Sequence, residues 1–175
     1  VAVGIAAASA AMAADPTGAE IFEQGAPSGA PACSACHGAD GHGSDDGQFP
    51  AIAGLDAAYL AKQIADFKAG RRVNDTMTPI AEMLTDAEVA AVTARVAAMP
   101  PAGPKGEGSK AGAAIATVGR WDLGVPGCES CHGAGGVGAG THFPALAGQK
   151  APYIVAQFGE WRSGNRNNSP LRLMK

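Results

Sequence analysis

The 175-residue sequence predicts an all-α protein made of two tandem copies of one small domain. Three observations lead to this prediction. The second half of the chain repeats the first in register, apolar residues recur at helical spacing in both halves, and strand signals are weak throughout. A segment rich in proline and glycine separates the two copies.

The internal repeat is clearest at a Cys-X-X-Cys-His motif that occurs twice. One copy runs from Cys33 to His37 and the other from Cys128 to His132, so they lie 95 residues apart (128 − 33). Farther along the chain the offset is 94 (143 − 49). The matching pairs there include Phe49 and Phe143, Pro50 and Pro144, Tyr59 and Tyr153, Gln63 and Gln157, Gly70 and Gly164, Arg72 and Arg166, and Asn74 and Asn168.

The repeat and the linker define the domains. Residues 100–109 carry proline or glycine at most positions and show no hydrophobic periodicity, as expected of a linker. We therefore place the first domain at 15–99, the linker at 100–110 and the second domain at 111–175. Nothing in the second copy corresponds to the last helix expected in the first, so we expect the second domain to lack a C-terminal helix in this sequence.

The central helix of each domain is predicted from an apolar stripe. Leu60, Ile64 and Phe67 fall at positions i, i+4 and i+7, which places them on one side of a helix. Asp56 is a suitable N-cap for this helix, and Gly70 is a suitable stop. The second copy repeats the stripe with Ile154, Phe158 and Trp161, and the stop with Gly164.

Two more helices are expected in the first domain. Thr85 and Glu88 have the spacing of a capping box, which predicts a helix that ends at the prolines after Met99. A short helix is expected over 17–24, with a counterpart over 111–118. The inner face of the capped helix is expected to carry Val89, Val92, Val96 and Met99.

Composition restricts the classes of partner and the kind of core. The net charge is −3, the pI is about 5.8 and there is no basic run, so neither nucleic acid nor an anionic membrane surface is favoured. Aromatic residues make up only 5%, against 25 glycines and 12 prolines. Domains of about 80 residues are marginal by burial alone. Each domain therefore needs something large and apolar inside it.

The first residues are typical of export. Residues 1–14 are apolar apart from Ser9, and they contain the small-residue pattern Ala11-Met12-Ala13 before Asp15. This is typical of the second half of a secretory signal peptide and predicts the periplasm. An ordinary alanine-rich helix and an uncleaved membrane anchor are the alternatives, although a full span needs about 20 residues.

The two Cys-X-X-Cys-His motifs predict two covalently bound haem c groups. In this motif the two thiols add to the vinyl groups of a haem, and the imidazole binds the iron. A Cys₄ zinc site is disfavoured because a whole domain separates the two cysteine pairs. A dithiol redox site is disfavoured because no βαβ pattern surrounds the motifs. A disulfide within each motif is disfavoured because it would be strained. The predicted haem-binding residues are Cys33, Cys36, His37, Cys128, Cys131 and His132.

The other axial ligand of the first iron is expected to be Met77. It lies in a polar segment that we expect to be an irregular loop, from which a thioether can reach the iron. The alternatives are Met83, which we expect in the core, and His42, which lies only five residues (42 − 37) after the proximal histidine. Methionine opposite histidine raises the reduction potential and fills both axial positions.

In the second domain Met174 is the expected ligand, because it is the only methionine of that copy. His142 is the alternative, but it stands next to the repeated Phe-Pro-Ala segment.

Two pairs of repeated residues are candidates for support. The carbonyls of Pro50 and Pro144 could accept a hydrogen bond from the imidazole and fix its orientation, or these residues could be simple turn prolines. Arg72 and Arg166 could pair with haem propionates, or they could lie at solvated helix ends.

Taken together, these segments resemble the di-haem cytochromes c4. The resemblance rests on the paired Cys-His-Gly, Phe-Pro-Ala and methionine-containing segments in the same order, and it covers nearly everything after Asp15. It implies two class I cytochrome c domains, each wrapped around one covalent haem and related by a pseudo-two-fold axis. It also implies Met77 as ligand and supports the role of the Pro50 and Pro144 carbonyls.

The expected function is that of a periplasmic electron carrier and not of an enzyme. The resemblance implies transfer of single electrons from a quinol-oxidising cytochrome bc complex to a haem-copper oxidase. The alternative is a dedicated cytochrome subunit of a periplasmic or membrane-bound dehydrogenase, with membrane association through the N-terminal segment. A haem enzyme or gas sensor would need an open coordination position at the iron.

Overall fold

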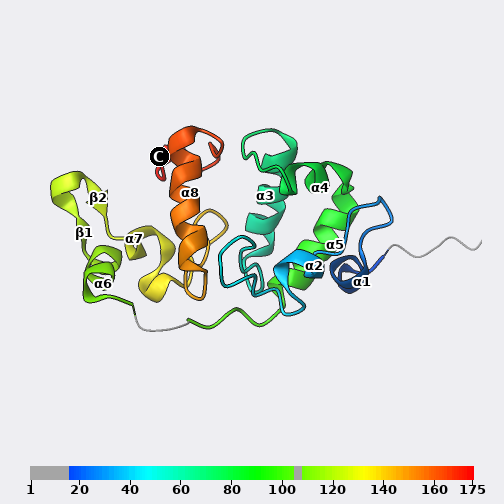
Figure 1. Ribbon diagram of the computed structural model, residues 1–175, viewed down its shortest axis with the longest axis horizontal. Helices are drawn as coiled ribbons and strands as arrows, with labels where there is room; N and C mark the ends of the chain where they lie inside the picture. Colours follow the sequence, from blue (N-terminus) through cyan, green and yellow to red (C-terminus); the bar gives the residue numbers. More distant parts are fainter. Residues whose placement is uncertain (1–15, 105–107) are drawn as a thin grey trace, which may run out of the picture.

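The computed structural model describes residues 16–104 and 108–175. The segment 1–14 and its predicted signal peptide lie outside the described residues. Two mostly helical domains stand next to each other, and α3 (Ala57–Lys68) of the first faces α8 (Ala151–Ser163) of the second (Figure 1). The all-α prediction is confirmed for the main elements. Within the described residues, no helix combines the length and hydropathy that a membrane span needs.

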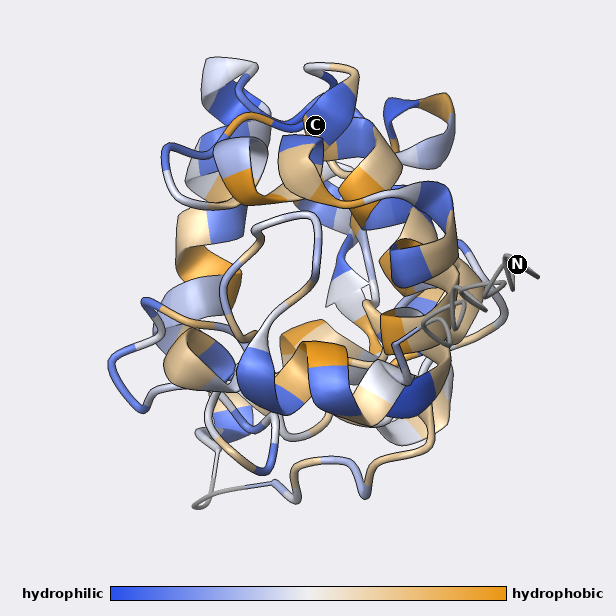
Figure 2. Ribbon diagram, turned by 90° about the vertical axis from the view of Figure 1, so that its right-hand side faces the viewer, coloured by the Kyte–Doolittle hydropathy of each residue, from blue (hydrophilic) through white to orange (hydrophobic). Residues whose placement is uncertain are grey.

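The first domain is built around the contact of its first and last helices. Its elements are α1 (Gly18–Gln24), α2 (Ser34–His37), α3, α4 (Met77–Met83) and α5 (Asp86–Ala97). Helix α5 packs on both α1 and α3. Hydrophobic and hydrophilic residues alternate along these helices (Figure 2), and the core between α1 and α5 contains Ile21, Phe22, Ala53, Val92, Val96 and Met99.

The predicted helix starts are confirmed by their caps. The Asp56 carboxylate accepts the amide of Tyr59 at 2.8 Å at the start of α3. Thr85 and Glu88 form the predicted capping box at the start of α5. A second box, formed by Thr17 and Glu20, begins α1. Side-chain oxygens here bind amides that have no partner inside the helix, which stabilises each helix start.

The methionine segment of the first domain differs from expectation. It was predicted to be an irregular loop, but Met77 is the first residue of α4. The Asn74 Oδ1 accepts the amides of Thr76 and Met77 at 3.1 and 2.9 Å, and this contact begins the helix. The expectation that Met83 packs in the core is wrong, because its exposed fraction is 48%. It lies two positions, or about 200° around the helix, from the buried Ala81.

The second domain repeats part of this plan and adds several short elements. It contains α6 (Lys110–Thr117), β1 (Gly119–Arg120), η1 (Trp121–Leu123), β2 (Val125–Pro126), α7 (Glu129–His132), η2 (Ala134–Gly136), α8 and η3 (Pro170–Arg172). The small β1–β2 hairpin was not expected from the sequence. It lies at the end of the molecule that is farthest from the first domain (Figure 1).

Apolar side chains of the second domain are less covered than those of the first. Among the described residues, no helix takes the place that α5 has in the first domain. Helix α6 has no buried residue, and Val155 and Phe158 of α8 are exposed. Trp161 is the buried hydrophobic residue of α8. The second domain therefore depends more on its bound group and on its neighbour.

Candidate haem sites

Each Cys-X-X-Cys-His motif forms one short helix. Helix α2 follows Cys33 and ends at His37, whose amide donates to the Cys33 carbonyl at 2.9 Å. Helix α7 follows Cys128 and ends at His132, with the same bond at 2.9 Å. Residues three apart lie on the same side of a helix, so both cysteines of each motif face one way. The four thiols are free and half-buried.

The histidines of both motifs are held by a proline carbonyl, which is the first of the two alternatives for Pro50 and Pro144. The His37 Nδ1 lies 2.9 Å from the Pro50 carbonyl oxygen, and the His132 Nδ1 lies 2.7 Å from that of Pro144. Each carbonyl accepts from its imidazole, which fixes the tautomer with Nε2 as the free nitrogen. Both rings are buried.

The free nitrogen of the second histidine has no partner among the residues that the structure describes. His132 Nε2 is buried and makes no hydrogen bond with any described residue. A buried polar atom without a partner is costly, so this nitrogen is suited to bind a metal ion. In the first domain, burial lowers the pKa of His37, and the positive charge of Arg72 adds to the effect. The first site therefore favours the neutral imidazole that iron requires, and the second offers a free, buried nitrogen, so the residues of both sites fit a haem.

A glycine after each motif brings the proline segment back to the histidine. The amide of Gly43 donates to the His37 carbonyl at 2.8 Å, and that of Gly138 donates to the His132 carbonyl at 2.7 Å. Gly43 has a φ of 70°, and a Cβ there would lie 2.2 Å from the Phe49 carbonyl oxygen. Only glycine permits this close approach of the two backbone segments.

The methionines of the described residues differ in burial. Met99 lies in the core, and Met83 is exposed. Met77 and Met174 are half-buried, as expected of side chains at the edge of a site. The alternative ligands are less suitable, since His42 contacts Asp40 and the Pro100 carbonyl, and His142 is exposed.

The two domains are joined through their backbones at equivalent residues. Arg72 and Arg166 form an antiparallel bridge. The amide of Val73 donates to the Asn165 carbonyl at 2.7 Å, and the amide of Asn167 donates to the Arg71 carbonyl at 2.8 Å. The contact therefore places repeated residues opposite each other, as a pseudo-two-fold relation requires.

The side chain of Arg72 reaches into the second domain. Its Nη2 donates to the Tyr153 hydroxyl at 2.6 Å and to Gln157 Oε1 at 3.1 Å. Its guanidinium lies over the Phe67 ring of its own domain, 4.6 Å from the ring centre. A planar cation that stacks on one side and donates at its edge is well suited to such a junction.

Arg166 makes the reciprocal contacts. Its Nη2 lies 3.3 Å from both the Tyr59 hydroxyl and Gln63 Oε1 of the first domain, and its guanidinium lies 4.2 Å from the centre of the Trp161 ring. Only 6% of Arg166 is exposed. Burial, and then the charge of Arg72, lower the pKa of this guanidinium. The alternative of a solvated helix end is therefore wrong for Arg166, and the pairing with propionates stays a prediction.

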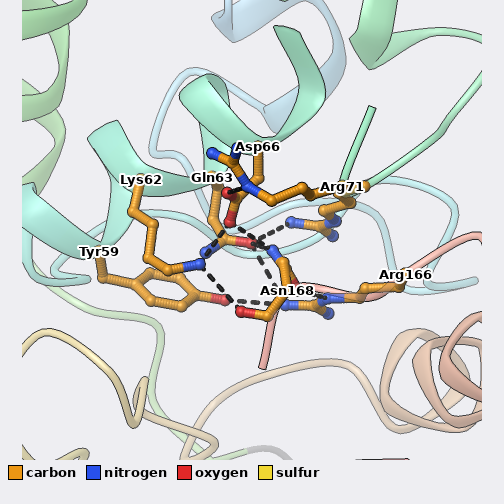
Figure 3. Close-up of polar contacts among 8 residues, drawn as sticks. Tyr59, Lys62, Gln63, Asp66, Arg71, Arg166 and Asn168 are labelled. Carbon is orange, nitrogen blue, oxygen red and sulfur yellow. Dashed lines mark hydrogen bonds and ion pairs between the residues drawn. The ribbon is translucent and has the colours of Figure 1, made fainter. Parts of the chain in front are cut away.

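A buried carboxylate, Asp66, belongs to the same group of polar residues as Arg166 (Figure 3). Only 1% of it is exposed, and it forms ion pairs with Lys62 and with Arg71, whose Nε lies 2.7 Å away. Asn168 of the second domain donates to its Oδ2 at 2.8 Å. Although burial raises it, the bonds from Lys62, Arg71 and Asn168 hold the pKa of this carboxyl below its usual value.

The sequence analysis missed Asp66. The repeat contains a signal for it. In both copies an acidic residue stands directly before the last aromatic residue of the apolar stripe: Asp66 before Phe67, and Glu160 before Trp161.

A further contact joins the backbone of the first domain to a side chain of the second. Gln149 Nε2 donates to the Ala51 carbonyl at 2.8 Å, and Gln149 Oε1 accepts the Ala51 amide at 3.0 Å. Lys150, which is buried, forms an ion pair with Asp45 at 2.8 Å. These contacts lie next to the Phe-Pro-Ala segment that holds the first histidine.

Comparisons with known proteins agree with this geometry. The model of the cytochrome c family matches residues 17–99. The thiosulfate dehydrogenase electron acceptor of Stutzerimonas stutzeri is 45% identical over 170 residues, which cover 94% of this chain and 78% of that protein. The cytochrome c4 of Thiocapsa roseopersicina is 39% identical over 147 residues, which cover 82% of this chain and 76% of that one.

The chain belongs to the cytochrome c4 family. This cytochrome carries two covalent haem c groups, one for each of the motifs that contain Cys33 and Cys128. It is an electron carrier, and its relatives are electron-transfer proteins. A solved structure, the as-isolated thiosulfate dehydrogenase TsdBA of Marichromatium purpuratum, superposes on it with a TM-score of 0.82 at 44% identity. That match covers 90% of this chain but only 35% of the TsdBA chain.

Proposed function

We propose that this di-haem cytochrome accepts electrons from a thiosulfate dehydrogenase in the periplasm. The observation that supports the proposal is the 45% identity over 94% of the chain to a thiosulfate dehydrogenase electron acceptor. The superposition on part of TsdBA supports it further, because there the equivalent segment shares a chain with the rest of a thiosulfate dehydrogenase. These findings favour a dedicated dehydrogenase partner over general transfer from a bc complex to an oxidase.

We also propose the residues that hold the two haems. Cys33, Cys36, Cys128 and Cys131 form the thioether bonds, His37 and His132 are the proximal ligands, and Met77 and Met174 are the distal ligands. The bound haem supplies a reversible one-electron iron couple. The protein orients the imidazoles through the proline carbonyls. Two protein ligands on each iron leave no position for oxygen, so outer-sphere transfer is the expected chemistry.

The choice of electron donor can be tested by stopped-flow absorption. The oxidised cytochrome is mixed either with thiosulfate and the catalytic subunit of a thiosulfate dehydrogenase, or with a quinol and a cytochrome bc complex. We expect reduction of both haems in the first mixture at a rate that follows the concentration of dehydrogenase. Reduction by the bc complex alone, with none by the dehydrogenase, would contradict the proposal.

A further inference from the structure

One asparagine of the repeat makes different contacts in the two domains. In the first domain, Asn74 accepts the amide of Met77 and so begins α4 within its own domain. Its equivalent is Asn168 (74 + 94), which is half-buried and turns toward the other domain. Asn168 Nδ2 donates to Asp66 Oδ2 at 2.8 Å, and the Asn168 carbonyl accepts from Lys62 Nζ at 2.9 Å (Figure 3).

Asn168 Nδ2 also donates to Gln63 Oε1 at 2.9 Å, and Gln63 recurs as Gln157, but Lys62 and Asp66 do not recur. At the positions of Lys62 and Asp66, the second copy has Ala156 and Glu160. No hydrogen bond or ion pair of the described residues involves the Glu160 carboxylate. The first domain therefore holds a segment of the second, and the reverse contact does not occur at the equivalent positions.

The held segment leads directly to the proposed ligand of the second iron. Between Asn168 and Met174 the chain makes η3, in which Leu171 and Arg172 have φ values of 48° and 60°. Residues other than glycine rarely adopt this left-handed region, so the segment is strained at both positions. Within the segment, the Met174 amide makes one long hydrogen bond, 3.4 Å, to the Ser169 hydroxyl.

The segment gains little from packing. Leu171 is 92% exposed, and Leu173 is also exposed. A strained and exposed segment keeps one conformation only when its ends are tied down. Asn168 is the end that is tied to the first domain, and the proposed iron–sulfur bond would tie the other.

We propose that Asp66, together with Lys62, is a positioning residue for the distal ligand segment of the second haem. The first domain thereby controls the axial ligation of the second iron, whereas the Met77 segment is positioned inside its own domain. This inference rests on the proposed function in one respect only, which is that Met174 binds the iron.

The test uses the holoprotein with Asp66→Ala and, separately, Asn168→Ala. Proton NMR of the reduced protein shows a ring-current-shifted methyl resonance for each iron-bound methionine, and Met77→His and Met174→His variants assign them. We expect both alanine variants to weaken the Met174 resonance and to allow carbon monoxide to bind the second haem. The Met77 resonance should be unchanged.

Hydrogen exchange provides a readout that does not depend on the iron. Loss of the hydrogen bond between Asn168 and the charged Asp66 should speed amide exchange in residues 171–174 by at least about tenfold. The matched controls are Glu160→Gln, which should change neither haem, and Asn74→Ala, which should affect Met77 alone.

Asn168→Ala is the decisive variant, because it leaves the ion pairs of Asp66 within the first domain intact. An unchanged Met174 resonance and unchanged exchange in Asn168→Ala would overturn the inference and leave the proposed function standing. An equal effect of Asp66→Ala on Met77 would also overturn it. Absence of any iron-bound Met174 resonance in the unsubstituted protein would refute the proposed ligand and the inference together.

Discussion

Single atoms decide the chemistry of each haem site. His132 Nδ1 donates a hydrogen bond to the Pro144 carbonyl, and His132 Nε2 is buried without a hydrogen-bond partner among the described residues. This pairing leaves one nitrogen to bind iron and prevents rotation of the ring. The same carbonyl contact at His37 shows that the geometry was kept in both copies. The two methionines proposed as distal ligands lie in segments apart from the histidine motifs, so the distal side is less constrained.

At this scale, Met77→His should lower the potential of the first haem and abolish its iron–methionine absorption band. Axial ligands span roughly 0.8 V of potential, and replacing methionine by histidine moves the couple toward lower values. Spectroelectrochemical titration measures both effects. Met83→Leu, at the exposed end of the same helix, is the matched control and should leave the potential unchanged. A Met77→His protein with unaltered potentials would rule out Met77 as the ligand.

Among the helices, α5 makes the difference between the two domains. It begins with the Thr85–Glu88 capping box and buries Val92 and Val96 against α1. Glu88 Oε1 also accepts the Ser28 amide at 3.1 Å, so the same carboxylate ties the α1–α2 loop to the start of α5. The hydrogen bond from the Thr85 backbone lowers the pKa of Glu88 to about 2, and Ser28 contributes.

This pKa predicts how stability depends on acidity. A carboxyl with a lowered folded-state pKa stabilises the fold above its ordinary pKa of 4.5, and the stabilisation is lost as the pH falls toward about 2. Glu88→Gln should therefore lower the free energy of unfolding by about 1 kcal/mol at pH 7. The difference from the unsubstituted protein should vanish as the pH approaches about 2. Urea unfolding at several pH values measures this.

Glu20→Gln in the capping box of α1 is the control. Because Glu20 is fully exposed, its pH-dependent effect should be smaller. An equal or larger effect of Glu20→Gln would contradict the role assigned to Glu88.

For the whole molecule, the interface between α3 and α8 is the main feature. Each interdomain arginine, Arg72 or Arg166, stacks on a ring of its own domain and donates to a tyrosine of the other. Within the described residues, neither guanidinium has a carboxylate partner. Their neighbours are neutral oxygens, so these arginines join the two domains through polar contacts that depend on orientation.

Arg166→Ala should loosen this interface. Removal of hydrogen bonds from a buried charged group costs about 1.5–3 kcal/mol for each bond lost. We expect the thermal unfolding of the holoprotein to separate into two transitions, with the second domain unfolding first. Scanning calorimetry detects the change. Arg162→Ala, which removes an exposed arginine of α8, should change the free energy of unfolding by less than about 0.5 kcal/mol. A single transition in Arg166→Ala would show that other contacts suffice.

Most of the first domain could be predicted from local patterns. The helix expected over 17–24 begins one residue later, and the caps at Asp56 and Thr85 are as predicted. The start of α4 was missed because Asn74 acts through a side-chain contact that spacing alone does not reveal. The β1–β2 hairpin was missed because two-residue strands leave no alternating pattern.

By itself, the sequence determined the two haem attachment motifs and the duplication, and it offered the proline carbonyls as one of two alternatives. Covalent attachment and a helical turn depend on residues that are near in sequence, so their spacing is sufficient. Only the tertiary structure decided that Arg72 and Arg166 cross between the domains and that Asp66 binds Asn168. These partners are about 100 residues apart, and two copies of one unit offer the same local pattern at both sites. Which copy holds the other depends on how the domains pack.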